Sequence, residues 1–155
     1  DVTDVEHPTQ LDKVEIGDSG TDSAALSDHK AFLFDKEKNL LVIPARVVKN
    51  EATVSDKSGV TQPNIWYGAY VFGVTPEAGF TLRGTVEHGT GSDRYYYYGS
   101  SANEVKRSLY IGDVLYTLSS KKILANSLSQ INTTIITIPL PGGDDVLYPM
   151  MKGFE

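Results

Sequence analysis

The sequence contains no cysteine, and it also lacks any long apolar run. Without cysteine there are no disulfides, no thiolate chemistry and no Cys-based zinc sites, although the absence fits both cytosolic and exported proteins. No apolar stretch approaches the ~20 residues of a membrane-spanning helix. The first residues, Asp-Val-Thr-Asp-Val, include no initiator Met and no charged-then-apolar export signal. We therefore expect a piece of a longer chain with no membrane span.

Clustered positive charge is also missing. Residues 1–28 contain eight acids against Lys13 alone, and the remaining residues carry twelve acids and thirteen bases. Because proteins bind nucleic acid through clustered Lys and Arg that neutralise phosphates, this distribution argues against a DNA or RNA partner.

Helical patterns are absent, whereas strand patterns are frequent. Hydrophobic residues make up 40% and aromatic residues 10% of the chain, a composition typical of a folded globular domain. Alternating or continuous apolar runs bounded by turn residues predict about nine strands. The expected strands are residues 13–16, 30–35, 39–45, 67–74, 80–87, 106–111, 114–118, 122–125 and 133–140.

Several of these strands are apolar on both faces, for example 31–34, 40–43 and 135–138. The links 36–38 and 112–113 are too short for parallel crossovers, so the strands that they join form antiparallel hairpins. Antiparallel sheets buried on both sides without helices must be covered by other sheets. The sequence therefore predicts an all-β fold of four-stranded antiparallel blades, a partial β-propeller of about two blades plus one extra strand.

Chain order groups the strands into a single propeller-type domain fragment over residues 1–155. One blade covers 30–88, a linker 89–105, a second blade 106–140 and a tail 141–155, while the strand at 13–16 belongs to a preceding blade. The polar stretch 48–65 is interpreted as a long exposed loop. In the strand 80–87, Phe80, Leu82 and Val86 alternate with polar residues, which is typical of an outermost blade strand with one wet face.

A family resemblance supports this fold. The segments GTDS (20–23), DHKAFLF (28–34), LLVIP (40–44), GAYVF (68–72) and RSLYIGDVLYTLS (107–119) occur in this order. Together they resemble a family of secreted bacterial and archaeal proteins whose C-terminal β-propeller is distantly similar to WD-repeat propellers. The resemblance spans about 14–128 and implies export and a propeller fold, and it brings no catalytic residues. A whole propeller needs four or more blades, so only part of one is present.

Two clusters of polar residues invite a functional interpretation. Asp18 and Asp22 lie on a loop rich in glycine and hydroxyl groups, and such oxygen ligands suit calcium. Asp28 and His29 precede the most apolar strand and are candidates for ligand binding, although blade corners also use such residues to hold neighbouring strands. His88 has the same two interpretations.

Aromatic residues form a third candidate site. Trp66 and Tyr67 are adjacent, and the linker contains the run Tyr95, Tyr96, Tyr97 and Tyr98. Tyr and Trp provide rigid amphipathic contact area for a sugar or a protein partner. In a strand, neighbouring side chains would instead point to opposite faces and partly pack.

The tetrapeptide Gly17-Asp18-Ser19-Gly20 matches the nucleophile motif of chymotrypsin-like proteases, but four residues do not make a catalytic triad. The preferred interpretation is a non-catalytic secreted or cell-surface module that binds a protein or a glycan, with no cofactor unless calcium is bound. The alternative is a glycan-active or other hydrolytic propeller whose site is completed by blades outside this chain. Because two blades leave apolar faces uncovered, we also expect the fragment to self-associate.

Overall fold

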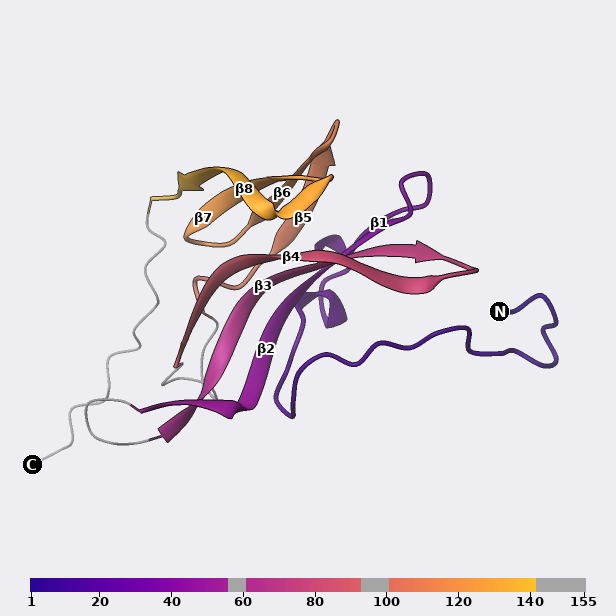
Figure 1. The fold of residues 1–155 in the computed structure, drawn as a ribbon, viewed down its shortest axis with the longest axis horizontal. Helices are drawn as coiled ribbons and strands as arrows, with labels where there is room; N and C mark the ends of the chain where they lie inside the picture. Colours follow the sequence, from indigo (N-terminus) through magenta and orange to yellow (C-terminus); the bar gives the residue numbers. More distant parts are fainter. Residues whose placement is uncertain (56–60, 93–100, 142–155) are drawn as a thin grey trace, which may run out of the picture.

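Two four-stranded antiparallel sheets make up the fold (Figure 1). A computed structural model of the chain describes residues 1–55, 61–92 and 101–141. Within these residues the only helical elements are two 3₁₀ turns, η1 (Ala24–Leu26) and η2 (His29–Ala31). The expected fold class, four-stranded antiparallel blades with almost no helix, is confirmed.

The first sheet has the strand order β1-β2-β3-β4. Its strands are β1 (Leu33–Asp35), β2 (Leu40–Ser55), β3 (Thr61–Thr75) and β4 (Gly79–Ser92). The link 36–38 makes the expected hairpin, since Asp35 pairs with Leu40. A three-residue turn joins β3 and β4, and Gly79, the first residue of β4, adopts a φ of +64° that favours glycine.

The second sheet has the strand order β5-β6-β7-β8. Its strands are β5 (Arg107–Ile111), β6 (Val114–Leu118), β7 (Lys122–Ser127) and β8 (Gln130–Pro139). The two-residue link 112–113 closes the β5–β6 hairpin, with Gly112 at a φ of +59°. Both sheets therefore run as meanders in which each strand pairs with the next, as the short links require.

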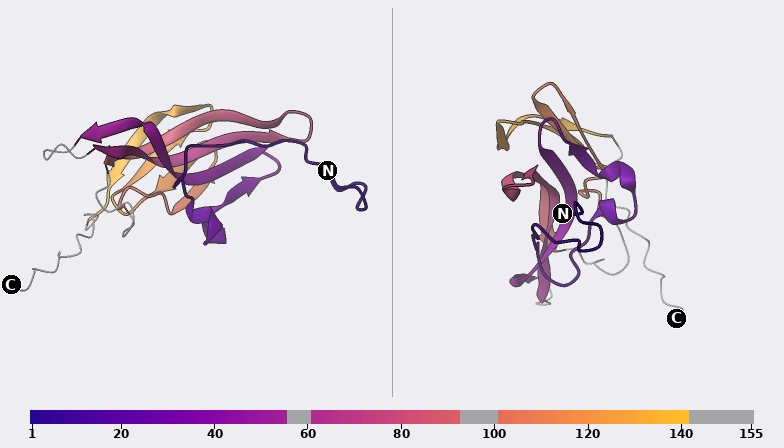
Figure 2. Two further views of the ribbon diagram at one scale, coloured as in Figure 1. Left: turned by 90° about the horizontal axis from the view of Figure 1, so that it is seen from below. Right: turned by 90° about the vertical axis from the view of Figure 1, so that its right-hand side faces the viewer.

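The core lies between the two sheets, which are stacked face to face (Figures 1 and 2). Strand β4 packs against β7 and β8. The core residues are almost all aliphatic: Leu40, Val42, Ala69, Val71, Val86, Val105, Leu115, Leu124, Leu128 and Ile131. The second sheet therefore covers one face of the first sheet, whose strands are apolar on both faces.

At the beginning of the chain one expected strand is wrong and another is confirmed only in part. Residues 13–16 form no strand. This segment runs alongside the first sheet without pairing to it. The strand expected at 30–35 shortens to β1, since residues before it form η2. The Asp28 carboxylate causes this change: it accepts a hydrogen bond from the Lys30 amide, 2.9 Å, and so caps the 3₁₀ turn.

The long loop expected at 48–65 is also wrong for residues 48–55 and 61–65, whereas residues 56–60 lie outside the described part of the chain. Strand β2 continues to Ser55 and β3 begins at Thr61, and the two remain paired, with a bulge between Lys49 and Thr53. The polar composition suggested a loop, but the stretch contains β-branched residues, including Thr53 and Val54, that favour strands.

The simple alternation expected along 80–87 is interrupted by one bulge, and a second bulge follows directly after this range. Phe72 pairs with Leu82 and Val71 with Gly84, so Arg83 is unpaired; a second bulge leaves His88 unpaired. Each bulge moves the following residues to the opposite face. Val86 consequently lies in the core at 1% exposure, whereas Leu82 is 54% exposed.

Residues 17–23 cover the free edge of β2. Asp22 and Arg46 exchange backbone hydrogen bonds of 2.9 and 2.8 Å, and the Asp18 amide donates to the Val48 carbonyl, 2.9 Å. Gly17 and Gly20 adopt φ values of +70° and +93° within this turn. The tetrapeptide 17–20 therefore helps to protect a sheet edge from pairing with another chain.

Candidate functional site

The first candidate residues, Asp28 and His29, lie at the junction of the two sheets. Besides capping η2, the Asp28 carboxylate forms an ion pair with Arg107 of β5, 2.7 Å. The Lys30 amide first, and Arg107 second, lower the pKa of Asp28 below its usual value, because both stabilise the charged form. His29 is exposed. Asp28 thus has a structural contact, and ligand binding by the pair stays a prediction.

Further contacts join β1 and the turn after it to β5 and the turn after it. The Tyr110 hydroxyl donates to the Asp35 carboxylate, which holds the pKa of Asp35 down and raises that of Tyr110. Lys38 lies 3.6 Å from Asp113 and 5.3 Å from the centre of the Tyr110 ring. A line of polar contacts therefore fixes one blade edge against the next.

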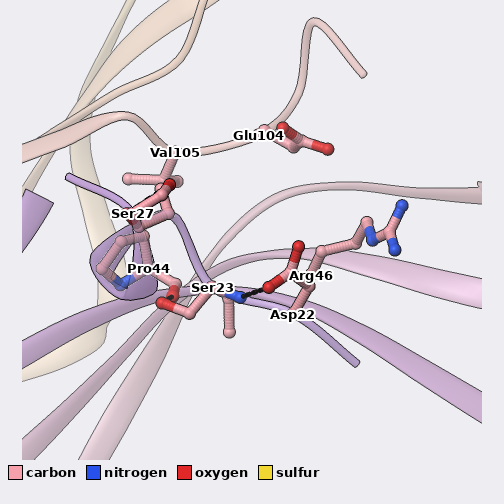
Figure 3. Close-up of a pocket in the computed structure, with 9 residues that line it drawn as sticks. Asp22, Ser23, Ser27, Pro44, Arg46, Glu104 and Val105 are labelled. Atoms are coloured by element: carbon pink, nitrogen blue, oxygen red, sulfur yellow. Dashed lines mark hydrogen bonds between the residues drawn. The ribbon is translucent and has the colours of Figure 1, made fainter. Parts of the chain in front are cut away.

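A pocket of about 310 Å³ opens where the segment before β5 approaches η1 and β2 (Figure 3). Asp22 and Arg46 lie on one wall and Glu104 on the facing segment. The Asp22 carboxylate accepts from the Ser23 amide, 2.8 Å, and Ser23 donates its hydroxyl hydrogen to the Pro44 carbonyl. The carboxylates of Asp22 and Glu104 and the guanidinium of Arg46 therefore line the pocket. The hydrogen bonds of Asp22 and Ser23 hold part of its wall in place.

The calcium residues Asp18 and Asp22 lie on the turn that covers β2. Both residues are exposed, and Asp22 also lines the pocket. Within the described residues, no group of three or more His, Cys, Asp or Glu side chains is placed to hold a metal ion. Calcium also takes carbonyl and hydroxyl oxygens, so calcium at this turn stays a prediction.

The adjacent aromatic residues Trp66 and Tyr67 lie on opposite faces of β3. Tyr67 is only 3% exposed and is part of the buried interior. Trp66 is partly exposed on the outward face, and its indole Nε1 donates to Glu87 Oε2, 3.0 Å. The structure does not bring the two side chains together, because neighbouring residues of a strand alternate between faces.

Trp66 instead begins a row of rings along the outward face of the first sheet. We call Trp66, Tyr70, Phe72 and Phe80 the aromatic row. Their ring centres are 5.2, 6.1 and 6.1 Å apart in sequence order, alternately edge-to-face, stacked and edge-to-face. The even spacing 66, 70, 72 along one strand was the signal that could have revealed the β3 members; Phe80 joins them through the β3–β4 hairpin.

The N-terminal segment crosses this face. Residues 14–17 and the rings of Tyr70, Phe72 and Phe80 line a groove of about 420 Å³. The Asp12 carboxylate anchors the segment by accepting from the Phe80 amide, 2.7 Å. Phe72 is covered at 4% exposure, whereas Phe80 remains 37% exposed. The row therefore offers ring surface beside a groove, which is a geometry suited to binding.

Comparison with known proteins identifies the fold family. The model of the β-propeller domain family matches residues 1–131. The chain belongs to this β-propeller family. No curated protein and no solved structure matches the chain significantly. The match covers all of the first sheet and most of the second, so the two sheets are blades of a propeller.

The electrostatic environment of three aspartates bears on acid catalysis. The pKa values of Asp12, Asp28 and Asp35 are lowered, which favours the charged form rather than the protonated form that a general acid needs.

In the described part of the chain, no helix is long and apolar enough to cross a membrane. Tyr95, Tyr96, Tyr97 and Tyr98 lie outside the described residues.

Proposed function

We propose that this propeller domain is a non-catalytic module that binds a protein or glycan partner outside the cell. The aromatic row carries the proposal. It places the partly exposed rings of Trp66 and Tyr70 and the exposed ring of Phe80 on one outward face, beside a groove. Aromatic faces bind sugar rings and apolar side chains with little loss of conformational entropy.

Binding to an array of polysaccharides and to a panel of cell-envelope proteins tests the proposal. Truncating a central aromatic contact typically weakens binding by about tenfold or more, so Trp66→Ala and Phe80→Ala should each do so. Trp66→Phe, which keeps a ring, should retain most of the affinity. Tyr116→Ala provides the control, because Tyr116 is a partly exposed tyrosine of the second sheet. Equal affinity of wild type and both aromatic variants, with unchanged melting temperatures, would contradict the proposal.

Export to the cell surface or medium is the second part of the proposal. It rests on the resemblance to secreted propeller proteins. Detection of the full-length protein in the surface or medium fraction of its source cells would support export. Detection in the cytosol alone would contradict it.

One observation favours the hydrolytic alternative. The pocket in Figure 3 has carboxylates on two facing segments, Asp22 and Glu104, as glycoside hydrolysis by paired acids requires. In that case the Asp22→Asn and Glu104→Gln variants would each abolish cleavage of a chromogenic glycoside or polysaccharide. Under the binding proposal, the wild type cleaves none of them.

A further inference from the structure

His88 occupies an unusual place at the junction of the two blades. It is the residue that the second bulge of β4 leaves unpaired, between the pairs Gly68–Glu87 and Tyr67–Gly89. Its side chain is 1% exposed and lies against the second sheet. A histidine buried in an interface between sheets must satisfy its two ring nitrogens there, or leave one without a partner.

The ring of His88 bonds across the interface through one nitrogen only. Nε2 lies 2.8 Å from the hydroxyl oxygen of Thr117, a residue of β6 with 0% exposure. The other nitrogen, Nδ1, is buried and has no hydrogen-bond partner among the residues that the structure describes. Neutral imidazole tolerates this arrangement, because Nδ1 can be the unprotonated nitrogen; imidazolium cannot, since it would bury a second N–H donor without an acceptor.

The surrounding charges also oppose a proton on His88. Lys122, the only titratable residue of β7, acts on it with a positive charge. Strand β8 contains no titratable residue, and β6 supplies the neutral Thr117. On β3, Tyr67 is buried in the same interior and its side chain is a phenol, not a carboxylate. On β4 itself, Glu87 pairs with Trp66 on the outward face, and Glu104, from the segment before β5, lines the pocket of Figure 3.

We propose that His88 is an acid-sensitive latch between the two blades, which holds them together while it is neutral and releases them when it takes up a proton. When the interface opens, water hydrates the imidazolium, and the ring moves away from the positive charge of Lys122. The latch does not involve the aromatic row, so a test that fails for His88 leaves the proposed binding function unaffected.

The pH range follows from the ring's environment. Burial first, and Lys122 second, lower the pKa of His88 from 6.5 to about 4. Between these two values the closed state keeps the ring neutral while the open or unfolded state binds a proton, so stability is lost as the pH falls from about 6.5 towards 4. The lowered carboxyl pKa values of Asp28 and Asp35 act in a separate range, since their contribution is lost only below about 3.8.

Urea unfolding of the 155-residue chain between pH 7.5 and 4.2 tests the latch. One proton taken up on opening raises the unfolding equilibrium constant by up to about tenfold per pH unit in this range. His88→Gln, which keeps a polar side chain opposite Thr117 but binds no proton, should remove that component. His29→Gln is the matched control, because His29 is exposed, and it should retain the pH dependence of the wild type.

Two further measurements locate the effect. Histidine NMR titration of the wild type should show the His88 ring still neutral at pH 5, and this holds even if His88→Gln fails to fold. Amide hydrogen exchange, corrected for its intrinsic pH dependence, should speed up at Thr117 and along β4 as the pH falls towards 4.5. A wild-type slope that persists in folded His88→Gln, or a His88 ring that titrates near pH 6.5 in the folded chain, would overturn the proposal.

Discussion

At the residue scale, Gly84 shows how closely the two blades approach each other. A Cβ added at this position would lie 2.5 Å from Asn132 Oδ1 and 2.9 Å from Ile131 Cβ of the second sheet. The neighbouring Thr85 amide donates to the same Asn132 oxygen, 3.0 Å. A side chain at position 84 would therefore push β8 away from β4.

We predict that Gly84→Ala destabilises the chain by about 2 kcal/mol, as is typical of overpacking in a well-packed interface. Gly73→Ala in β3 is the control, since the nearest atom to an added Cβ there is 3.7 Å away. Its effect should stay within about 1 kcal/mol. Urea denaturation measures both, and equal free energies of unfolding for the two variants would show that the blades do not meet at Gly84.

The candidate residues differ in how far the sequence could place them. Strand alternation predicts that Trp66 and Tyr67 lie on opposite faces once both belong to one strand, but the sequence does not tell which of them is buried. The sequence does not predict the Asp28–Arg107 ion pair, because the residues are far apart in sequence and the stacking of the sheets brings them together. His88 could not be placed either, since a bulge that no local pattern reveals directs it into the interface.

At the scale of elements, the hairpins were predictable and their lengths were not. The links 36–38 and 112–113 are so short that they fix antiparallel pairing from the sequence alone. The sequence does not predict that β2 continues past residue 48 or that β3 begins before residue 65, because polar residues occur in strands as well as in loops. The missing strand at 13–16 reflects side-chain and turn contacts, such as Asp12 to the Phe80 amide, rather than a ladder.

The contact between β1 and β5 makes a prediction about acid stability. Because the Tyr110 hydroxyl lowers the pKa of Asp35, the pair stabilises the fold at neutral pH, and this stabilisation is lost as the pH falls below about 3.8. Tyr110→Phe should raise the pKa of Asp35 towards its usual value and flatten the loss of stability below pH 4.

NMR titration of the Asp35 side-chain carbonyl measures this shift directly. Tyr116→Phe, on the neighbouring strand β6, serves as the control and should leave Asp35 unchanged. An Asp35 pKa that is the same in Tyr110→Phe and in the wild type would mean that the hydroxyl does not bond to it in solution.

At the scale of the whole molecule, the two outward blade faces differ. The N-terminal segment crosses the outward face of the first sheet. The paired residues of the second sheet place Leu109, Ile136 and Ile138 on its outward face, where they are 42%, 52% and 42% exposed. In a propeller each blade face packs on the next, so exposed aliphatic side chains on this face favour association.

We predict that the chain self-associates through the outward face of the second sheet. Sedimentation at tens of micromolar should detect dimers or larger species, and Ile136→Lys with Ile138→Lys should shift them to monomer. Leu82→Lys, on the outward face of the first sheet, is the matched control, because Leu82 is 54% exposed there. A stable wild-type monomer at these concentrations would contradict this prediction.

The central structural claim is that residues 33–92 stack on residues 107–139 as consecutive blades. Nuclear Overhauser contacts between the two sheets test this claim most directly. Strand β4 lies against β8, with Gly84 next to Ile131, and His88 bonds to Thr117. Stacked blades should give cross-peaks from the Gly84 Hα protons to the Ile131 methyl groups and from the His88 ring to the Thr117 methyl group. Intact strand patterns within each sheet without either inter-sheet contact would contradict this claim, because the two sheets would then not be stacked blades.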